Sequence, residues 1–91
     1  MGVARRSRVD IVVDVLSALA DRGPMPPTRL ATASNLPYDR LRPILEALEA
    51  RGLVRLSSMG GRRLVELTPE GLRALEELRR VSGLLRDLGL A

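Results

Sequence analysis

The chain has 91 residues, enough for one small domain but not for two, because a chain of this length buries only roughly 60 to 65% of its unfolded surface. Hydrophobic residues make up 45% of it, yet it has no Phe, no Trp and a single Tyr, so its core must be aliphatic, as in packed helices. The net charge is +4, and all 15 basic residues are Arg, whose planar guanidinium binds phosphate groups and guanine edges.

The chain lacks both Cys and His. It therefore has no disulfide, no thiolate metal site, and neither the usual zinc ligand nor the usual general base near neutral pH. No pair of carboxylates can be assigned to acid-base catalysis, so we predict no enzymatic activity, no metal and no cofactor. No apolar run reaches the ~18 to 20 residues of a membrane span, and the start of the chain lacks the apolar region of a signal peptide. The sequence thus indicates a soluble cytoplasmic protein.

The basic residues are unevenly placed along the chain. Residues 1–8 and 51–63 are basic and contain no acidic residue, whereas residues 64–91 hold four Arg against five acidic residues. We therefore expect an anionic partner to meet the start of the chain and the region near residue 60. The Arg residues of the two basic stretches are Arg5, Arg6, Arg8, Arg51, Arg55, Arg62 and Arg63.

Apolar residues recur at helical spacing over residues 7–22, with acidic residues on the opposite side, which predicts a first amphipathic helix. Gly23 and Pro24 end this helix. A second, short helix is predicted over residues 28–33, before the SNLP turn. The two helices are thus separated by a segment, GPMPP, that cannot be helical.

A third helix is predicted up to Gly52. Pro43 would disturb a helix that begins at Pro37 or Tyr38, because proline has no N–H and its ring crowds the preceding turn. We therefore expect either a late start with Asp39 as the N-cap or an opening turn of 3₁₀ type. The apolar stripe of this helix consists of Leu41, Ile44, Leu45 and Leu48.

Residues 53–67 read LVRLSSMGGRRLVEL, two short β-type runs joined by a Ser/Gly turn. The only charges at the tip are Arg62 and Arg63. An arginine-tipped hairpin that follows a helix and precedes TPEG looks like the wing of a winged-helix DNA-binding domain. Alternatively, the two Arg residues are ordinary charges that keep an edge hairpin from aggregating.

The last helix is predicted to begin with Thr68 as N-cap and Pro69 as first residue and to reach about Leu88. Leu72 and Leu75 are expected to join the core. A second stripe alternates steps of four and three residues, the spacing of a coiled-coil seam, and predicts a homodimer through this helix. The alternative is that the helix folds back onto its own domain. The stripe consists of Ala74 and four expected interface residues, Leu78, Val81, Leu85 and Leu88.

The segment from Arg8 to Leu88 resembles the small archaeal winged-helix transcription regulators, which include dimeric chromatin-associated proteins with a C-terminal coiled coil. The motifs that carry the resemblance are LEARGLV at residues 48–54 and LTPEGLRALEEL at residues 67–78. The resemblance implies an α+β, mostly helical fold: a winged helix-turn-helix of three helices, a two-stranded β-hairpin wing and a long C-terminal helix. It also implies an antiparallel pairing of the last helices, with the third helix in the major groove and the wing on adjacent backbone or minor groove.

We accordingly divide the chain into a flexible basic arm (1–7), a winged helix-turn-helix domain (8–67) and a C-terminal dimerisation helix (68–91). Arg42 can instead pair with Glu46 on the same helix, and Tyr38 can instead cover the edge of the core. The predicted DNA contacts are Tyr38, Arg40 and Arg42 of the third helix, Arg62 and Arg63 of the wing, and Arg5, Arg6 and Arg8 of the arm.

The sequence therefore predicts a dimeric, nucleoid-associated protein that binds double-stranded DNA and regulates transcription. No site for a small-molecule effector is expected, since the domain and the dimer helix use up the chain. The main alternative is a winged-helix module that binds another protein, which Asp39, Glu46 and the apolar last helix favour. RNA binding is disfavoured because Tyr38 is the only aromatic stacking platform.

Overall fold

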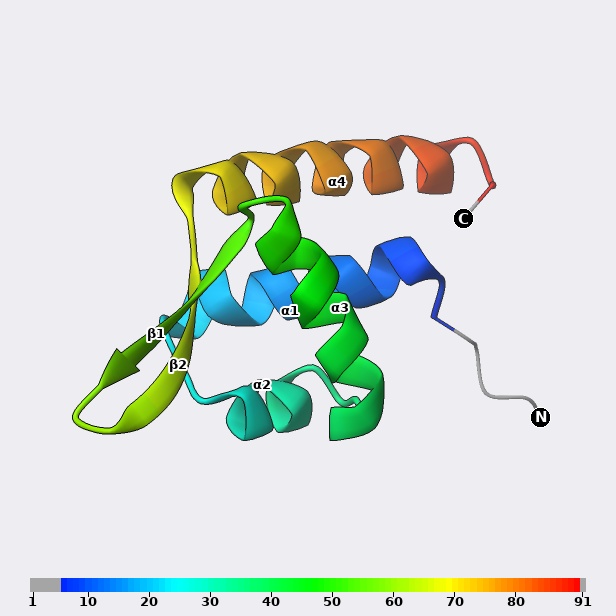
Figure 1. Ribbon diagram of the computed structural model, residues 1–91. Coiled ribbons are helices and arrows are strands. Elements are labelled where there is room, and N and C mark those ends of the chain that lie inside the picture. The colour runs from blue at the N-terminus through cyan, green and yellow to red at the C-terminus, as the bar shows by residue number, and fades with distance from the viewer. Residues whose placement is uncertain (1–5, 91) are drawn as a thin grey trace.

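The computed structural model describes residues 6–90. Within them the fold consists of helices and one antiparallel β-hairpin, which confirms the predicted α+β class and the order of the elements (Figure 1). The elements are α1 (Arg8–Arg22), α2 (Pro27–Ala33), α3 (Tyr38–Ala50), β1 (Val54–Met59), β2 (Arg62–Leu67) and α4 (Pro69–Asp87).

Helix α1 begins and ends where its sequence signals predict. The Ser7 hydroxyl accepts a hydrogen bond from the Asp10 N–H, and the Asp10 carboxylate accepts one from the Ser7 N–H, which together form a capping box. Gly23 ends the helix with φ of 84°, a conformation that side chains with a Cβ rarely adopt. Local signals alone thus fix both ends of α1.

The prediction for the start of α3 was wrong about Asp39. The N-cap is Pro37, and the helix is α-helical from Tyr38 onward with Pro43 inside it. The Pro37 carbonyl accepts hydrogen bonds from the N–H groups of both Arg40 and Leu41, at 3.0 and 3.1 Å, so the opening turn does contain one 3₁₀-type bond. Pro43 removes only the bond to the carbonyl of Asp39, an exposed residue, and water can hydrate that carbonyl.

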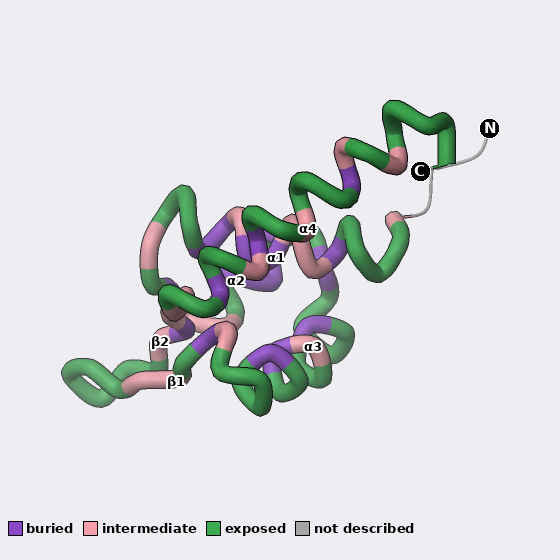
Figure 2. Tube along the Cα trace, turned by 90° about the horizontal axis from the view of Figure 1, so that it is seen from above, coloured by how far each residue is buried: buried purple, intermediate pink, exposed green. Residues whose placement is uncertain are grey.

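Helix α1 runs through the centre of the domain, with α4 on one side and α2 on the other, while α3 crosses in front of it (Figure 1). The helices α1 and α4 are antiparallel, and Arg79 of α4 donates a hydrogen bond of 2.9 Å to the Ser17 hydroxyl of α1. Buried residues gather where the helices meet (Figure 2). The largest of the fully buried hydrophobic side chains are Val15, Leu16, Leu30, Leu41, Val54, Val65 and Leu75.

The hairpin is short and regular. Gly60 and Gly61 form its two-residue turn with φ of 59° and 78°, the positive values that a type I′ turn requires at both positions. At its base, Met25 from the loop between α1 and α2 exchanges two backbone hydrogen bonds with Val65, of 3.2 and 2.8 Å. The base of the hairpin is thereby anchored to the helices, while its tip extends away from them (Figure 1).

Helix α4 is fastened to the start of β1 through its first turn. The Thr68 hydroxyl accepts a hydrogen bond from the Gly71 N–H and donates one of 2.6 Å to the Gly52 carbonyl. Gly71 lies so close to the Leu53 carbonyl that a Cβ there would overlap it. Leu75 is fully buried, so α4 shares the core of the domain that precedes it.

The prediction that Leu72 joins the core was wrong, because its side chain is 44% exposed. Gly71 and Leu75 form the buried face of this part of α4. Leu72 follows Gly71 by one residue and is therefore rotated by about 100° around the helix, away from that face.

Candidate nucleic-acid interface

Three parts of the fold lie on the side of the domain opposite α4: the tip of the hairpin, helix α2 and the first turn of α3 (Figure 1). This side therefore carries the predicted contact residues of both α3 and the wing. Helices α2 and α3 with the turn between them form a helix-turn-helix, in which the second helix commonly enters the major groove of DNA.

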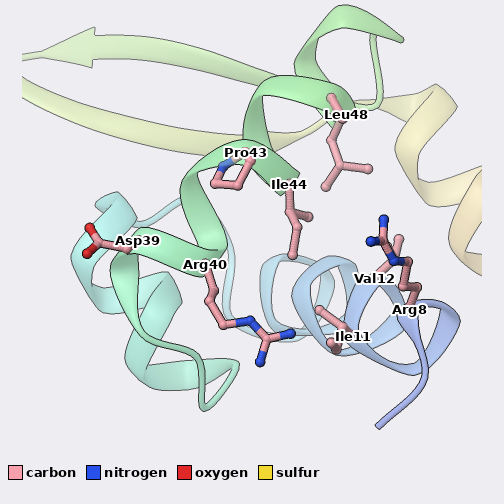
Figure 3. A pocket seen from close by; sticks show the side chains of 9 residues that line it. Arg8, Ile11, Val12, Asp39, Arg40, Pro43, Ile44 and Leu48 are labelled. Carbon is pink, nitrogen blue, oxygen red and sulfur yellow. The ribbon is translucent and has the colours of Figure 1, made fainter.

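The predicted contact residues of α3 occupy different sides of the helix. Arg42 lies 3.7 Å from the Glu46 carboxylate, the pairing that the sequence allowed, and both side chains are about two-thirds exposed, at 68% and 69%. Arg40 lies on the opposite flank, where its side chain extends toward α1 (Figure 3). Tyr38, in the first turn of α3, is 41% exposed.

The two arginines of the wing point to opposite faces of the hairpin. Arg62 pairs with Met59 and Arg63 pairs with Ser58, and side chains of consecutive residues in a strand alternate between faces. Nearer the base, Arg55 forms an ion pair of 3.1 Å with its cross-strand partner Glu66. Within residues 6–90, Arg62 and Arg63 form no ion pair, so their charges are available to an anionic partner.

Of the predicted basic arm, residues 1–7, the structure describes only Arg6 and Ser7. Arg5 lies outside the described residues. Arg6 donates hydrogen bonds of 2.7 Å to the backbone carbonyls of Ser34 and Asn35 and of 2.8 Å to the Asp14 carboxylate. It therefore fastens the turn between α2 and α3 to α1, in place of the mobile DNA contact that the sequence suggested.

We expect the Arg6→Gln variant to unfold at a lower urea concentration, with a loss of about 1 to 2 kcal/mol, since three hydrogen bonds to a charged but partly exposed group disappear. Equilibrium unfolding followed by circular dichroism measures this loss. Arg29→Gln is the matched control, because Arg29 is exposed and makes no side-chain hydrogen bond within the described residues. Equal stability of the two variants would contradict the role given to Arg6.

The second half of α4 carries an exposed apolar stripe, which we call the α4 stripe: Val81, Leu84 and Leu88, exposed by 43%, 56% and 61%. Its spacing of three and four residues places these side chains on one face of the helix. Of the predicted interface residues, Leu78 packs partly against the domain's own core and Leu85 is half-buried. Figure 2 shows that this part of α4 is largely exposed and lies away from the buried centre.

A groove of about 530 Å³ separates α1 from α3 (Figure 3). Its apolar lining comes from both helices, and Arg8 of α1 and Arg40 of α3 flank it. Arg8, one of the predicted DNA contacts, lies at this groove. The remaining lining residues are Ile11, Val12, Asp39, Pro43, Ile44, Ala47 and Leu48.

Sequence reasoning missed three residues that the fold makes prominent. Met59 is 70% exposed at the tip of the wing beside Arg62, and the Gly-Gly turn was the signal that could have placed it there. Arg29 lies exposed on α2, on the same side of the domain. Leu84 belongs to the α4 stripe. The sequence prediction chose the neighbouring Leu85, because Leu85 also fits the steps of three and four residues.

Across residues 6–90, no group of three His, Cys, Asp or Glu side chains is placed to hold a metal ion. None of the helices in this part of the chain combines the length and the apolar character that crossing a bilayer demands.

A helix-turn-helix followed by a two-stranded β-hairpin is the arrangement of a winged-helix protein. The chain belongs to the winged helix-turn-helix family, whose pattern it matches over residues 5–86. Among curated protein sequences, none matches it.

Solved structures with this fold include DNA-binding proteins. Sso10a-2, a DNA-binding protein from Sulfolobus solfataricus, is 18% identical with a TM-score of 0.82, over 91% of this chain and 85% of that one. BpsR of Bordetella bronchiseptica, whose DNA binding is regulated by 6-hydroxynicotinic acid, is 28% identical with a TM-score of 0.76, over 85% of this chain. The MarR family transcriptional regulator SPO1453 of Silicibacter pomeroyi is 32% identical with a TM-score of 0.68, over 88% of this chain. The chain spans only 57% of the length of each of these two regulators.

Proposed function

We propose that this protein binds double-stranded DNA and regulates transcription. The observation that carries the proposal is the placement of the wing tip, α2 and the start of α3 on one side of the domain, with Arg62 and Arg63 at the tip in no ion pair with any residue from 6 to 90. The similarity to BpsR and SPO1453 supports it. In this reading α3 enters the major groove, and the wing reaches adjacent backbone or minor groove, where the exposed Met59 can pack against sugars or bases. Such a protein acts at the nucleoid, in the cytoplasm.

The DNA-bound form in this proposal is a homodimer that pairs through the α4 stripe. Three exposed leucine or valine side chains in one row form an apolar surface, and its exposure to water is unfavourable in free energy. Two copies related by a twofold axis would bury their stripes against each other and present two winged domains to two half-sites. Each half would add its own phosphate contacts to the same complex, which strengthens binding.

The test is fluorescence anisotropy of a labelled random-sequence duplex titrated with the protein over a series of salt concentrations. We expect submicromolar binding at low salt and a steep decrease in affinity as the salt concentration rises, because bound arginines release counterions from the phosphates. If duplex DNA is not bound at low salt, the proposal is wrong, and a stoichiometric protein partner recovered under the same conditions would favour the protein-binding alternative.

Replacing both Arg62 and Arg63 by Ala should weaken this binding about 10- to 100-fold at moderate salt and make the salt dependence less steep by about one unit for each lost phosphate contact. The control is the double variant Arg73→Ala, Arg80→Ala, which removes the same charge from ion-paired positions on α4, on the opposite side of the domain. If both double variants lose affinity equally, only net charge matters and the wing does not contact DNA.

A further inference from the structure

The side of α3 that faces away from the core carries a row of exposed residues, two of them acidic. The steps of four, three and four residues between its members place them on one face of the helix, opposite the buried Leu41 and Leu45. If α3 lies in the major groove, as in the proposed function, this face meets the floor of that groove. The row, which we call the outer row of α3, consists of Asp39, Pro43, Glu46 and Ala50.

The two carboxylates of the outer row, Asp39 and Glu46, do not suit the DNA backbone. The Asp39 carboxylate points away from α1 (Figure 3), and it forms no ion pair with any residue from 6 to 90. Phosphates repel a carboxylate, and no hydrogen-bond donor on the backbone offsets that repulsion. The outer row therefore suits only a part of the duplex that offers donors.

In the major groove the bases offer two kinds of donor, the N4 amino group of cytosine and the N6 amino group of adenine. Adenine also has the acceptor N7 beside its amino group. A side-chain amide matches this pair of groups with its own donor and acceptor, whereas a carboxylate has no donor for N7. Cytosine has no such neighbouring acceptor. A carboxylate on the floor of the major groove therefore favours cytosine.

Arg42 supplies the complementary donor beside Glu46. The two side chains lie 3.7 Å apart and are 68% and 69% exposed, so their ion pair contributes little to stability and can open when a ligand binds. A guanidinium can donate two parallel hydrogen bonds to O6 and N7 of guanine. Its charge also offsets part of the cost of removing the neighbouring carboxylate from water. Together, Arg42 and Glu46 match the two bases of a C·G pair.

We propose that α3 recognises a C·G base pair in the major groove. Glu46 accepts a hydrogen bond from the cytosine N4 amino group, and Arg42 donates to O6 and N7 of the paired guanine. This inference rests on the proposed function and adds to it the class of DNA sequence, one with a C·G pair at a fixed position. Asp39 keeps this face of α3 away from the phosphates, so the arginines of the wing provide most of the binding that does not depend on sequence.

The first experiment selects bound duplexes from a pool with a randomised central segment, measures the fraction bound and sequences it. We expect the unmodified protein to enrich C·G at a fixed position. In the Glu46→Gln variant A·T should replace it at that position, because the Gln amide matches N6 and N7 of adenine. Glu49→Gln is the matched control, since it removes the same charge from an exposed position of α3 outside the outer row and should retain C·G.

The outcomes separate this inference from the proposed function. A C·G preference that is the same in the unmodified protein and in Glu46→Gln would overturn the role of Glu46. A pool that is bound with no preference for C·G at any position would overturn the inference but not DNA binding. If the pool is not bound at low salt, the proposed function fails, and the recognition of bases fails with it.

The second experiment measures anisotropy with the enriched duplex and with two altered forms of it. Exchange of the C·G pair for A·T should weaken binding of the unmodified protein at least about tenfold and strengthen binding of Glu46→Gln by a similar factor. Replacing the guanine by 7-deazaguanine, which lacks the N7 acceptor, should weaken binding of the unmodified protein about fivefold and leave Arg42→Ala unaffected. Equal losses in the two proteins would overturn the role of Arg42.

Discussion

The Leu84→Glu variant should sediment as a monomer at concentrations where we expect the unmodified protein to sediment as the proposed dimer. Leu84 is 56% exposed at the middle of the α4 stripe, and each such side chain contributes roughly 1.5 to 3 kcal/mol when it is buried against a partner. In a symmetric interface each copy would bury one such carboxylate, so the cost of desolvation is incurred twice. The dimer should therefore weaken by several orders of magnitude in dissociation constant.

Leu72→Glu is the matched control, because Leu72 is also an exposed leucine of α4, at 44%, but lies outside the stripe. Sedimentation velocity at several protein concentrations distinguishes the two variants. The half-buried Leu85 is a less informative site, since a charge there also disturbs the packing of the domain itself. A Leu84→Glu dimer as tight as the unmodified one would show that α4 pairs through another surface or not at all.

Replacing Gly71 by Ala should lower the free energy of unfolding by about 2 to 3 kcal/mol, even though Ala favours helices by about 1 kcal/mol over Gly. The new Cβ would overlap the Leu53 carbonyl and lie 2.6 Å from the Leu67 Cδ1, so the first turn of α4 must move away from the sheet. This movement also strains the two hydrogen bonds of the Thr68 hydroxyl, with the Gly52 carbonyl and with the Gly71 N–H.

Gly83→Ala on the same helix provides the comparison. A Cβ at Gly83 meets nothing within 4 Å, so this variant should be more stable by roughly 0.5 to 1 kcal/mol. Urea unfolding monitored by circular dichroism measures both changes. If Gly71→Ala were as stable as Gly83→Ala, helix propensity would outweigh the close approach, and the fastening of α4 would be looser than the structure indicates.

The fold could be predicted from the sequence because its signals are local. The capping box of Ser7 and Asp10, the two glycines of the wing and the cap that Thr68 makes on Gly71 each form between residues close together in the sequence. The start of α3 was predicted less well, since neither Pro37 nor Pro43 is a usual helix signal and only the surrounding fold shows that the lost hydrogen bond is exposed.

The site could be predicted only in part, because exposure and pairing depend on contacts between distant residues. The arginine tip of the wing follows from the turn, but Arg6 meets the turn between α2 and α3 across 28 and 29 residues of sequence. The direction of Arg40 depends equally on how α1 and α3 pack. The pattern of charges locates the arginines along the chain. It does not show which of them form hydrogen bonds or ion pairs with other residues of the folded chain.

Helix α4 takes part in two surfaces at once, since Leu75 completes the core of the domain and the α4 stripe begins only six residues later. If the stripe pairs, assembly stabilises the folded chain, and dilution shifts the equilibrium toward monomers, which unfold more readily. The melting temperature should then rise with protein concentration. A cell could thus set the lifetime of this protein, as well as its occupancy of DNA, by how much of it is made.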